Sequence, residues 1–181
     1  MPDKKKVLIV IDMQNDFIDG SLKNPDAKKI IPKICEYIEQ FDGDVYATLD
    51  THNNRYLDTM EGKHLPIEHC IQLTEGWCLN RDILDSIHKK YKVLVGQTIY
   101  KRTFGFNGWE DTLCNYDGYE SIELVGTCTD ICVISNALIL KSIFPETPII
   151  VHENMCAGST PQAHQKAIDI MKNCHIEVRN D

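Results

Sequence analysis

The stretch VGTCTDICV, residues 125–133, places two cysteines four residues apart where an apolar run meets a helical pattern. The run SIELVG (121–126) has the composition of a buried strand, and TDICVISNALILKSIF (129–144) has the length and apolar spacing of a helix. A strand that leads into a helix is the repeating unit of α/β proteins with a parallel sheet. The stretch therefore predicts a strand followed by a helix, with a thiol at the connection.

The same alternation continues on both sides of this stretch. The predicted strands cover residues 6–12, 44–50, 91–100, 121–126, 147–153 and 175–178. The predicted helices cover residues 25–41, 79–91, 107–116, 129–144 and 160–173. Alternation with right-handed connections predicts an α/β fold with a doubly wound, six-stranded, mostly parallel sheet and helices on both faces. No stretch rich in Pro, Gly or Ser divides the chain, so we expect one domain over residues 1–181.

The composition favours small-molecule partners. Hydrophobic residues make up 43% of the chain and charged residues 25%, which is ordinary for a globular protein with a sizeable core. The formal net charge is -8, and the basic cluster Lys4 to Lys6 precedes a strand. We therefore expect no nucleic-acid partner and no membrane partner. The first apolar run is short and ends in Asp12, which suits neither a signal peptide nor a membrane span, so we expect a cytoplasmic protein.

The chain contains eight cysteines. Without an export signal, a chain of this length is expected to keep them as free thiols rather than disulfides. Outside the stretch VGTCTDICV, we expect the cysteines to be small apolar core residues. These are Cys35, Cys70, Cys78, Cys114, Cys156 and Cys174.

Residues 50–80 interrupt the alternation. This segment is polar, contains three histidines and shows no clear helix or strand period. Long ordered loops in compact domains usually carry function. In a parallel sheet, ligands bind beyond the carboxyl ends of the strands, which makes the residues there candidates for a site. The residues at these strand ends are Asp12, Asp50, His52, Lys101 and Cys132.

Three of these residues are suited to nucleophilic catalysis. Cys132 is predicted in the first turn of a helix, where free N–H groups and the helix dipole stabilise a thiolate and can bind an oxyanion. Taken singly, a Cys after a strand is more often a core residue, and Lys101 would usually be a solvated charge. Asp12 alone is equally consistent with a general base and a helix cap. Together they supply a nucleophile, a base and a cation that favours the ionised thiol.

Four motifs identify the chain as resembling the isochorismatase-like cysteine hydrolases over nearly its whole length. They are VLIVIDMQNDF, IYKRTFGF, LVGTCTDICV and ENMCAGSTPQAH, in the family's order. The resemblance implies a triad in which Asp12 accepts protons, Lys101 is an electrostatic stabiliser and Cys132 is the nucleophile. It also implies a cis peptide between Thr127 and Cys128, with the N–H groups of Cys128 and Cys132 forming an oxyanion hole. Cys128 stands where the family usually has a small residue such as Ala.

The polar loop contains a candidate metal site. Asp50 and His52 are two residues apart in an extended segment and His69 follows later, a set that suits a metal with open positions. On spacing alone, such residues are more often ordinary polar loop residues. The sequence resembles the nicotinamidase, or pyrazinamidase, branch of the family in this pattern, and that resemblance implies Asp50, His52 and His69 as ligands. Glu61 is a candidate fourth ligand. The expected cofactor is one divalent ion, zinc first, with manganese or iron as alternatives.

The resemblance also bears on the substrate pocket. Phe17, five residues after Asp12, matches an aromatic residue that packs on the substrate ring in nicotinamidases. The sequence departs from that branch at Leu65, where a Trp is often found. The other wall could come from Phe104, Phe106 or Trp109, each of which could equally be a core residue.

The sequence therefore predicts an enzyme that hydrolyses a linear amide, converting nicotinamide to nicotinate and ammonia through a thioester. One alternative is a hydrolase of the same family that acts on another small amide or carbamoyl substrate, which the Leu65 departure keeps open. A second alternative, from another class, is a thiol redox or metal-sensing protein that uses Cys128 and Cys132. The expected partners are a small carboxamide and further copies of the chain, because members of the family commonly assemble.

Overall fold

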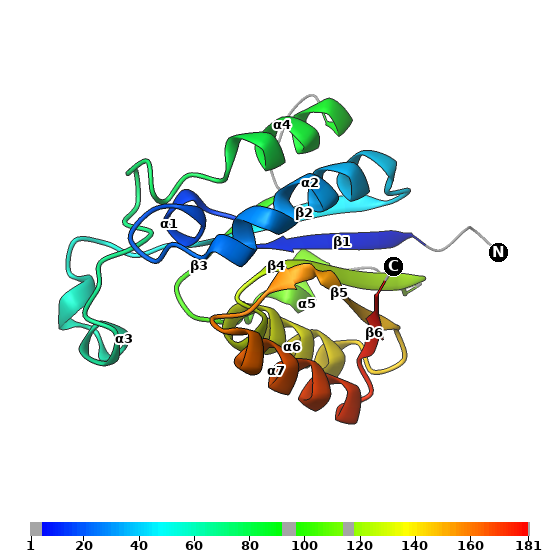
Figure 1. Ribbon diagram of the computed structural model, residues 1–181. Coiled ribbons are helices and arrows are strands. Elements are labelled where there is room, and N and C mark those ends of the chain that lie inside the picture. Colours follow the sequence, from blue (N-terminus) through cyan, green and yellow to red (C-terminus); the bar gives the residue numbers. More distant parts are fainter. Residues whose placement is uncertain (1–4, 92–96, 114–117, 181) are drawn as a thin grey trace.

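The computed structural model describes residues 5–91, 97–113 and 118–180, and its centre is a six-stranded sheet (Figure 1). The strands are β1 (Lys6–Ile11), β2 (Asp44–Asp50), β3 (Thr98–Lys101), β4 (Ser121–Thr127), β5 (Ile149–Ala157) and β6 (Glu177–Arg179). They lie in the order β3-β2-β1-β4-β5-β6, and each neighbouring pair is parallel. The predicted α/β fold is therefore confirmed.

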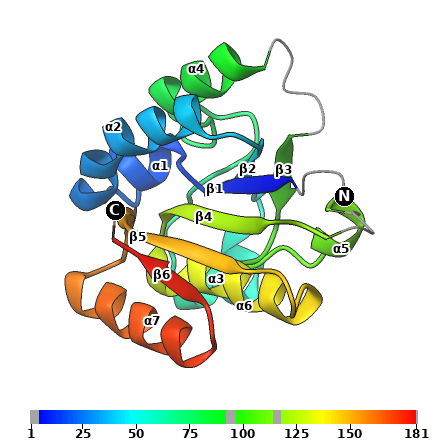
Figure 2. The same cartoon turned by 90° about the vertical axis from the view of Figure 1, so that its right-hand side faces the viewer.

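Helices cover both faces of this sheet (Figure 2). One face carries α1 (Asn15–Ile18), α2 (Pro25–Gln40) and α4 (Arg81–Lys90), and the other carries α5 (Trp109–Thr112), α6 (Ile134–Ile143) and α7 (Pro161–Asn173). Within the described ranges, none of the helices has the length and apolar character needed to cross a membrane.

The side chains of β1 build both hydrophobic cores. Val7, Ile9 and Ile11 pack with α5, α6 and α7, whereas Leu8 and Val10 pack with α2 and α4. Successive side chains of a strand point to opposite faces, so a strand covered on both faces must be apolar throughout. This requirement explains the unbroken apolar run at the start of the chain.

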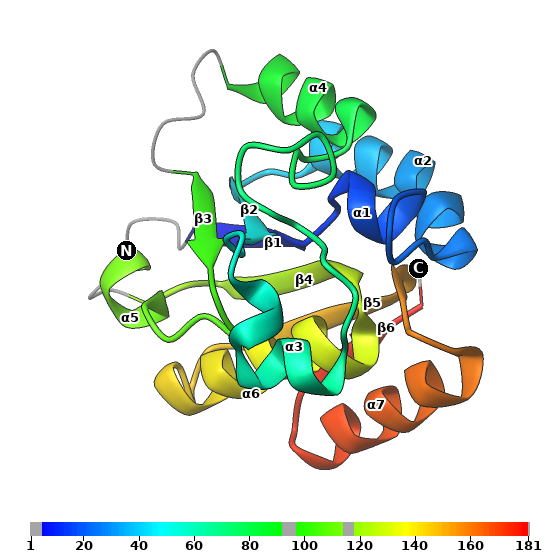
Figure 3. The same ribbon diagram turned by 90° about the vertical axis from the view of Figure 1, so that its left-hand side faces the viewer.

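The strand order reverses between β1 and β4. The chain proceeds from β1 to β2 and β3 on one side of the sheet and then crosses to β4, β5 and β6 on the other. Such a reversal opens a crevice at the carboxyl ends of the two central strands. Gly126, with a φ of +120°, lets β4 approach β1 there, because a side chain would meet the backbone of Ile11. Figure 3 views this end, where α3 (Met60–His64) lies in front of the sheet.

The segment 50–80 contains more regular structure than predicted. It holds a 3-10 turn, Tyr56–Asp58, followed by α3, whereas the sequence showed no helical period there. The reason is that α3 has only five residues, which is too short for an apolar repeat. A local cap stabilises it instead, because the Thr59 hydroxyl accepts a hydrogen bond from Gly62 N at 3.0 Å.

Two other elements differ from their predicted bounds. The helix predicted over 129–144 begins with a π-helical turn, Thr129–Val133, before α6 starts. β3 covers Thr98–Lys101, one residue beyond the end of the strand predicted over 91–100. Helix α5 covers Trp109–Thr112 and is shorter than the helix predicted over 107–116. Parts of those two predictions, residues 92–96 and 114–117, lie outside the described residues.

The cysteines of the described residues are free thiols. Cys70 and Cys156 are buried and Cys35 is half-buried, as predicted. Cys78 and Cys174 are exposed, so the prediction that they fill the core was wrong. Cys78 lies in the loop before α4 and Cys174 follows the last turn of α7, where neither faces the sheet. Cys114 lies outside the described residues.

A buried carboxylate lies between the sheet and α2. Glu123 on β4 accepts a hydrogen bond from the Tyr37 hydroxyl at 2.6 Å and from the Ser121 hydroxyl at 2.7 Å. Its Oε2 also lies 2.7 Å from His152 Nε2. Burial alone would raise the pKa of Glu123, but the hydrogen bonds of His152, Tyr37 and Ser121 outweigh burial and lower this pKa to about 2.

We predict that Glu123 makes the folded state sensitive to acid. Its pKa falls from 4.5 in the unfolded chain to about 2 in the fold, so the unfolded state binds the proton more tightly. The stabilisation present above pH 4.5 is therefore lost as the pH falls toward 2. Urea titrations at several pH values should show that the free energy of unfolding decreases less with falling pH in Glu123→Gln than in the parent protein. The exposed Glu120→Gln is the control, and equal acid sensitivity in both variants would contradict the prediction.

Candidate active site and metal centre

Lys101 lies at the centre of the crevice. It is 2% exposed, although lysine is rarely fully buried. Its Nζ lies 2.7 Å from Asp12 Oδ2 and 3.6 Å from Asp50 Oδ1, and it donates to Cys132 Sγ at 3.5 Å. The register of β2 and β3 sets Lys101 directly beside Asp50. The structure thus brings Asp12, Lys101 and Cys132 together from three strand ends.

Asp12 is held in place where β1 ends. Its φ of 47° is unusual for a residue other than glycine. Its N–H donates to the carbonyl of Thr48 at 3.2 Å and to the hydroxyl of Thr48 at 3.1 Å. The same hydroxyl donates to Asp12 Oδ1 at 2.6 Å. One carboxylate oxygen is therefore bound by Thr48, while the other faces Lys101.

Cys132 lies on the π-helical turn that follows β4. Cys128 begins this turn, and its carbonyl accepts hydrogen bonds from Ile131 N at 3.1 Å and Val133 N at 3.0 Å. The Thr127–Cys128 peptide is cis, so the bond implied by the family resemblance is present. The turn therefore places the backbone of Cys128 and the thiol of Cys132 at the same end of the sheet.

Side-chain contacts link this turn to α7 and to the residues just before it. The carboxylate of Asp130 accepts from the N–H and the hydroxyl of Ser159 at 2.7 and 2.6 Å. Thr129 Oγ1 lies 2.8 Å from His164 Nδ1. These contacts with Ser159 and His164 restrict the position of the turn.

Burial governs the protonation of these groups. Burial and the charge of Asp12 raise the pKa of the Cys132 thiol well above its ordinary value, and Lys101 opposes them only in part. Burial also raises the pKa of Asp12. Burial lowers the pKa of Lys101, but the charges of Asp12 and Asp50 raise it, and the ammonium stays protonated. The resting cysteine is therefore a protonated thiol, rather than the thiolate expected from its place in the helix.

A second cluster of two carboxylates and two imidazoles adjoins Lys101. Ligand atoms of Asp50, His52, Glu61 and His69 all lie within 4.8 Å of one another. Asp50 Oδ2 is 2.8 Å from His52 Nε2 and 3.5 Å from His69 Nε2. Glu61 Oε1 is 3.7 and 3.8 Å from the same two nitrogens. Ligands of a tetrahedral zinc ion lie roughly 3.4 Å apart, so the spacing and the donor types fit a divalent metal ion.

Neighbouring groups orient the candidate ligands. His69 Nδ1 lies 2.8 Å from the Ile67 carbonyl, which leaves Nε2 as the free ligand atom. Gln14 holds the backbone of Asp50 on both sides, accepting from its N–H at 2.8 Å and donating to its carbonyl at 2.9 Å. Burial would raise the pKa of Asp50, but hydrogen bonds to His52 and His69 and the charge of Lys101 hold it well below its usual range.

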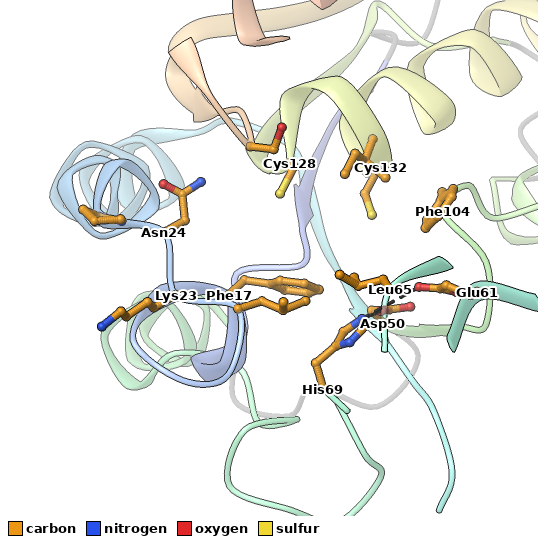
Figure 4. Close-up of a pocket in the computed structure, with 14 residues that line it drawn as sticks. Phe17, Lys23, Asn24, Asp50, Glu61, Leu65, His69, Phe104, Cys128 and Cys132 are labelled. Carbon is orange, nitrogen blue, oxygen red and sulfur yellow. Dashed lines mark ion pairs between the residues drawn. The ribbon is translucent and has the colours of Figure 1, made fainter. Parts of the chain in front are cut away.

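Both clusters open into one pocket of 320 Å³ (Figure 4). Apolar side chains form its walls, the candidate metal ligands reach it from one side, and two thiols point into it from the opposite side. Its lining includes Phe17, Leu65, Phe104, Asp50, Glu61, His69, Cys128 and Cys132. A mostly apolar pocket of this volume with a few convergent polar groups suits a small ring with one polar substituent.

Some sequence candidates lie outside this pocket. Of the three aromatic candidates for its second wall, Phe104 lines the pocket, whereas Trp109 is buried in the core and Phe106 packs against that core. His64 is exposed and its Nδ1 lies 2.8 Å from the Met60 carbonyl. His64 is therefore not part of the metal-ligand cluster.

The polar residues that support the site were not predicted from the sequence. Gln14 and Thr48 contact partners 36 positions away in the chain. Asp16 Oδ2 accepts from Cys70 N at 2.7 Å and so fixes the backbone directly after His69. Gln14 and Asp16 lie in the polar segment DMQND that follows a buried strand, and this polarity was the available sign of a role in the site. Their hydrogen-bond partners are distant in the sequence, so only the fold reveals them.

Comparisons with known proteins identify the family and the fold of the chain. The family profile described as the Isochorismatase domain matches residues 6–180. The nicotinamidase of Saccharomyces cerevisiae is 23% identical over 214 residues, an alignment that covers 96% of this chain and 98% of that protein. The pyrazinamidase/nicotinamidase of Streptococcus mutans UA159 superposes with a TM-score of 0.82 at 26% identity, covering 96% of this chain and 99% of that chain.

A further solved structure shares the fold. The pyrazinamidase of Pyrococcus horikoshii, solved in complex with zinc, has a TM-score of 0.76 and 24% identity, with 98% of this chain and 99% of that chain covered. The family profile spans nearly the entire sequence. The chain therefore belongs to the isochorismatase family and is a hydrolase.

Proposed function

We propose that this hydrolase is a metal-dependent cysteine amidase that converts nicotinamide to nicotinate and ammonia. The observation that carries the proposal is that Cys132 lines the same 320 Å³ pocket as Asp50, Glu61 and His69 of the metal-ligand cluster. Lys101, which is paired with Asp12, contacts the Cys132 sulfur at this pocket. The relatives named nicotinamidase and pyrazinamidase/nicotinamidase support the substrate class. We assign the roles of these residues from their contacts and chemistry.

The pocket accounts for recognition of the substrate. Phe17, Leu65 and Phe104 would enclose the pyridine ring between apolar surfaces. Asp50, His52, Glu61 and His69 would hold one divalent ion, zinc in our proposal, with manganese and iron as alternatives. When bound, the ion supplies a Lewis-acidic contact for the pyridine nitrogen. The amide carbon would then face Cys132 on the opposite side of the pocket.

The first half of the reaction forms a thioester. Asp12 accepts the proton of the Cys132 thiol as the sulfur attacks the amide carbon, which fits a thiol that is protonated at rest. The N–H groups of Cys128 and Cys132 stabilise the oxyanion, and the Lys101 ammonium, 3.5 Å from the sulfur, stabilises the negative charge that develops there. Asp12 then passes the proton to the leaving nitrogen, and ammonia departs.

The second half regenerates the enzyme. Water enters the place of ammonia, and Asp12 removes one of its protons as the oxygen attacks the thioester. The same N–H groups stabilise the second oxyanion. The carbon–sulfur bond then breaks, the Cys132 sulfur regains a proton from Asp12, and the product leaves as nicotinate after its carboxyl group releases a proton to water. In the resting site Asp12 and Asp50 favour the charged form of Lys101.

A different small carboxamide or carbamoyl compound is the second candidate substrate. Leu65 gives one wall an aliphatic rather than aromatic surface, which does not restrict the pocket to an aromatic ring. The thiol-redox alternative is less well supported. Burial raises the pKa of Cys128 to about 11, so its thiol is not activated for exchange at neutral pH.

We predict that Cys132→Ala lowers ammonia release from nicotinamide by roughly 10⁴-fold or more, because it removes the nucleophile. The measurement is steady-state ammonia release by the metal-loaded protein. Cys174→Ala is the matched control, because it removes an exposed thiol at the end of α7. Retention of substantial amidase activity by folded Cys132→Ala would contradict the assignment.

We predict that a chelator abolishes the activity and that added zinc restores it. His52→Ala should weaken metal binding by at least about a hundredfold, because it removes a direct ligand. Metal content by mass spectrometry and ammonia release should fall together in this variant. His64→Ala, an exposed histidine of the same loop, is the control and should keep both. Full activity in metal-free protein would contradict the proposed ligand role.

A further inference from the structure

Asn136 is a buried polar residue that the proposed mechanism does not use. It lies in the first turn of α6, four residues after Cys132, and is 0% exposed. A buried amide usually has hydrogen-bond partners for its donors and acceptors, so its contacts show what it stabilises. Asn136 contacts the turn that holds Cys132 and the segment that holds Phe104, two separate parts of the pocket lining.

All four hydrogen-bonding positions of the Asn136 amide are occupied. Its Oδ1 accepts from Phe106 N and from Trp109 Nε1, both at 2.9 Å. Its Nδ2 donates to the Cys132 carbonyl at 2.8 Å and to the Phe104 carbonyl at 3.1 Å. Two N–H donors face the oxygen and two carbonyls face the nitrogen, so only one orientation of the amide satisfies the set.

These bonds connect the nucleophile's turn to the segment that supplies a pocket wall. Phe104 lines the pocket but is 48% exposed, so packing alone holds its side chain weakly. Within the described residues, no other side chain bonds the backbone of Phe104 or Phe106. Gly105 also lies close against α6, because a side chain there would meet Ile139. Lys101 also reaches both sides, because its Nζ donates to the Thr103 carbonyl at 3.2 Å and to Cys132 Sγ at 3.5 Å. Asn136 is the polar link that bonds the backbone of Phe104 and Phe106 themselves to the Cys132 turn.

We propose that Asn136 is a positioning residue that sets the Phe104 wall relative to the Cys132 thiol, an inference that rests on the proposed function. Its loss would release Phe104 from the pocket while the triad side chains remain. Binding of the substrate ring should then weaken more than the chemical step. A misplaced wall of this kind can lower kcat/KM by roughly ten- to a hundredfold.

The test is a double-mutant cycle on Asn136→Ala and Phe104→Ala, with KM and kcat measured for nicotinamide. We expect each single variant to raise KM more than it lowers kcat, and the double variant to have the KM of Phe104→Ala alone. A residue needed only for folding would lower the active fraction, and thus kcat, at unchanged KM. The proposal would be overturned if the factors by which the two substitutions raise KM multiply in the double variant. An unchanged KM in Asn136→Ala would overturn it as well.

Two further variants keep the test decisive. Asn136→Asp keeps an oxygen acceptor for Phe106 and Trp109 but loses both amide N–H donors, and its second oxygen faces the carbonyls of Cys132 and Phe104. It should therefore raise KM as Asn136→Ala does, without leaving a cavity. Ser121→Ala is the matched control, since it removes a buried hydroxyl whose bond to Glu123 lies outside the pocket. Its KM should equal that of the parent protein. Thermal unfolding of every variant checks that folded proteins are compared.

A second readout needs no substrate. The rate at which iodoacetamide alkylates Cys132, followed by peptide mass spectrometry, should rise in Asn136→Ala and in Phe104→Ala, because the wall beside the thiol is loosened or removed. The double variant should react no faster than Phe104→Ala. If the parent protein releases no ammonia from nicotinamide, the proposed function fails, and these alkylation rates decide the role of Asn136 by themselves. A parent-like rate in Asn136→Ala would then overturn it.

Discussion

The buried ammonium of Lys101 is the constraint on which the site depends. A charge removed from water costs several kcal/mol unless it is paired and hydrogen-bonded. Lys101 meets this requirement with Asp12 at 2.7 Å and Asp50 at 3.6 Å, residues that end two other strands. The pairing is possible only when β1, β2 and β3 end at the same level of the sheet. The fold and the charged site therefore stabilise one another.

Asp50 links this ion pair to the candidate metal centre. The same carboxylate that faces Lys101 also lies within 3.5 Å of His52 and His69 nitrogens. Burial and the charge of Asp50 raise the pKa of the adjacent Glu61. A divalent ion held by both carboxylates would favour their ionised forms. Cys132 and the proposed ion would thus be linked electrostatically through Lys101 and Asp50.

Much of this arrangement could be predicted from the sequence, because parallel strands bring their carboxyl ends to one edge. That rule alone selected Asp12, Asp50, His52, Lys101 and Cys132. The rest depends on tertiary contacts. Helix α3 is too short to show a period, and the π-helical turn closes with backbone bonds that side-chain patterns do not encode. Thr48, Gln14 and Asn136 have partners on distant segments, so no local pattern reveals their roles. The protonated state of Cys132 depends on burial, which the sequence position did not disclose.

The most direct test of the account is whether nicotinamide turnover passes through a thioester on Cys132. Turnover in the presence of hydroxylamine measures this, because a second nucleophile competes with water for the acyl group. The account predicts nicotinohydroxamate alongside nicotinate, in a ratio that rises with hydroxylamine concentration. Turnover that yields nicotinate alone at every hydroxylamine concentration would contradict it.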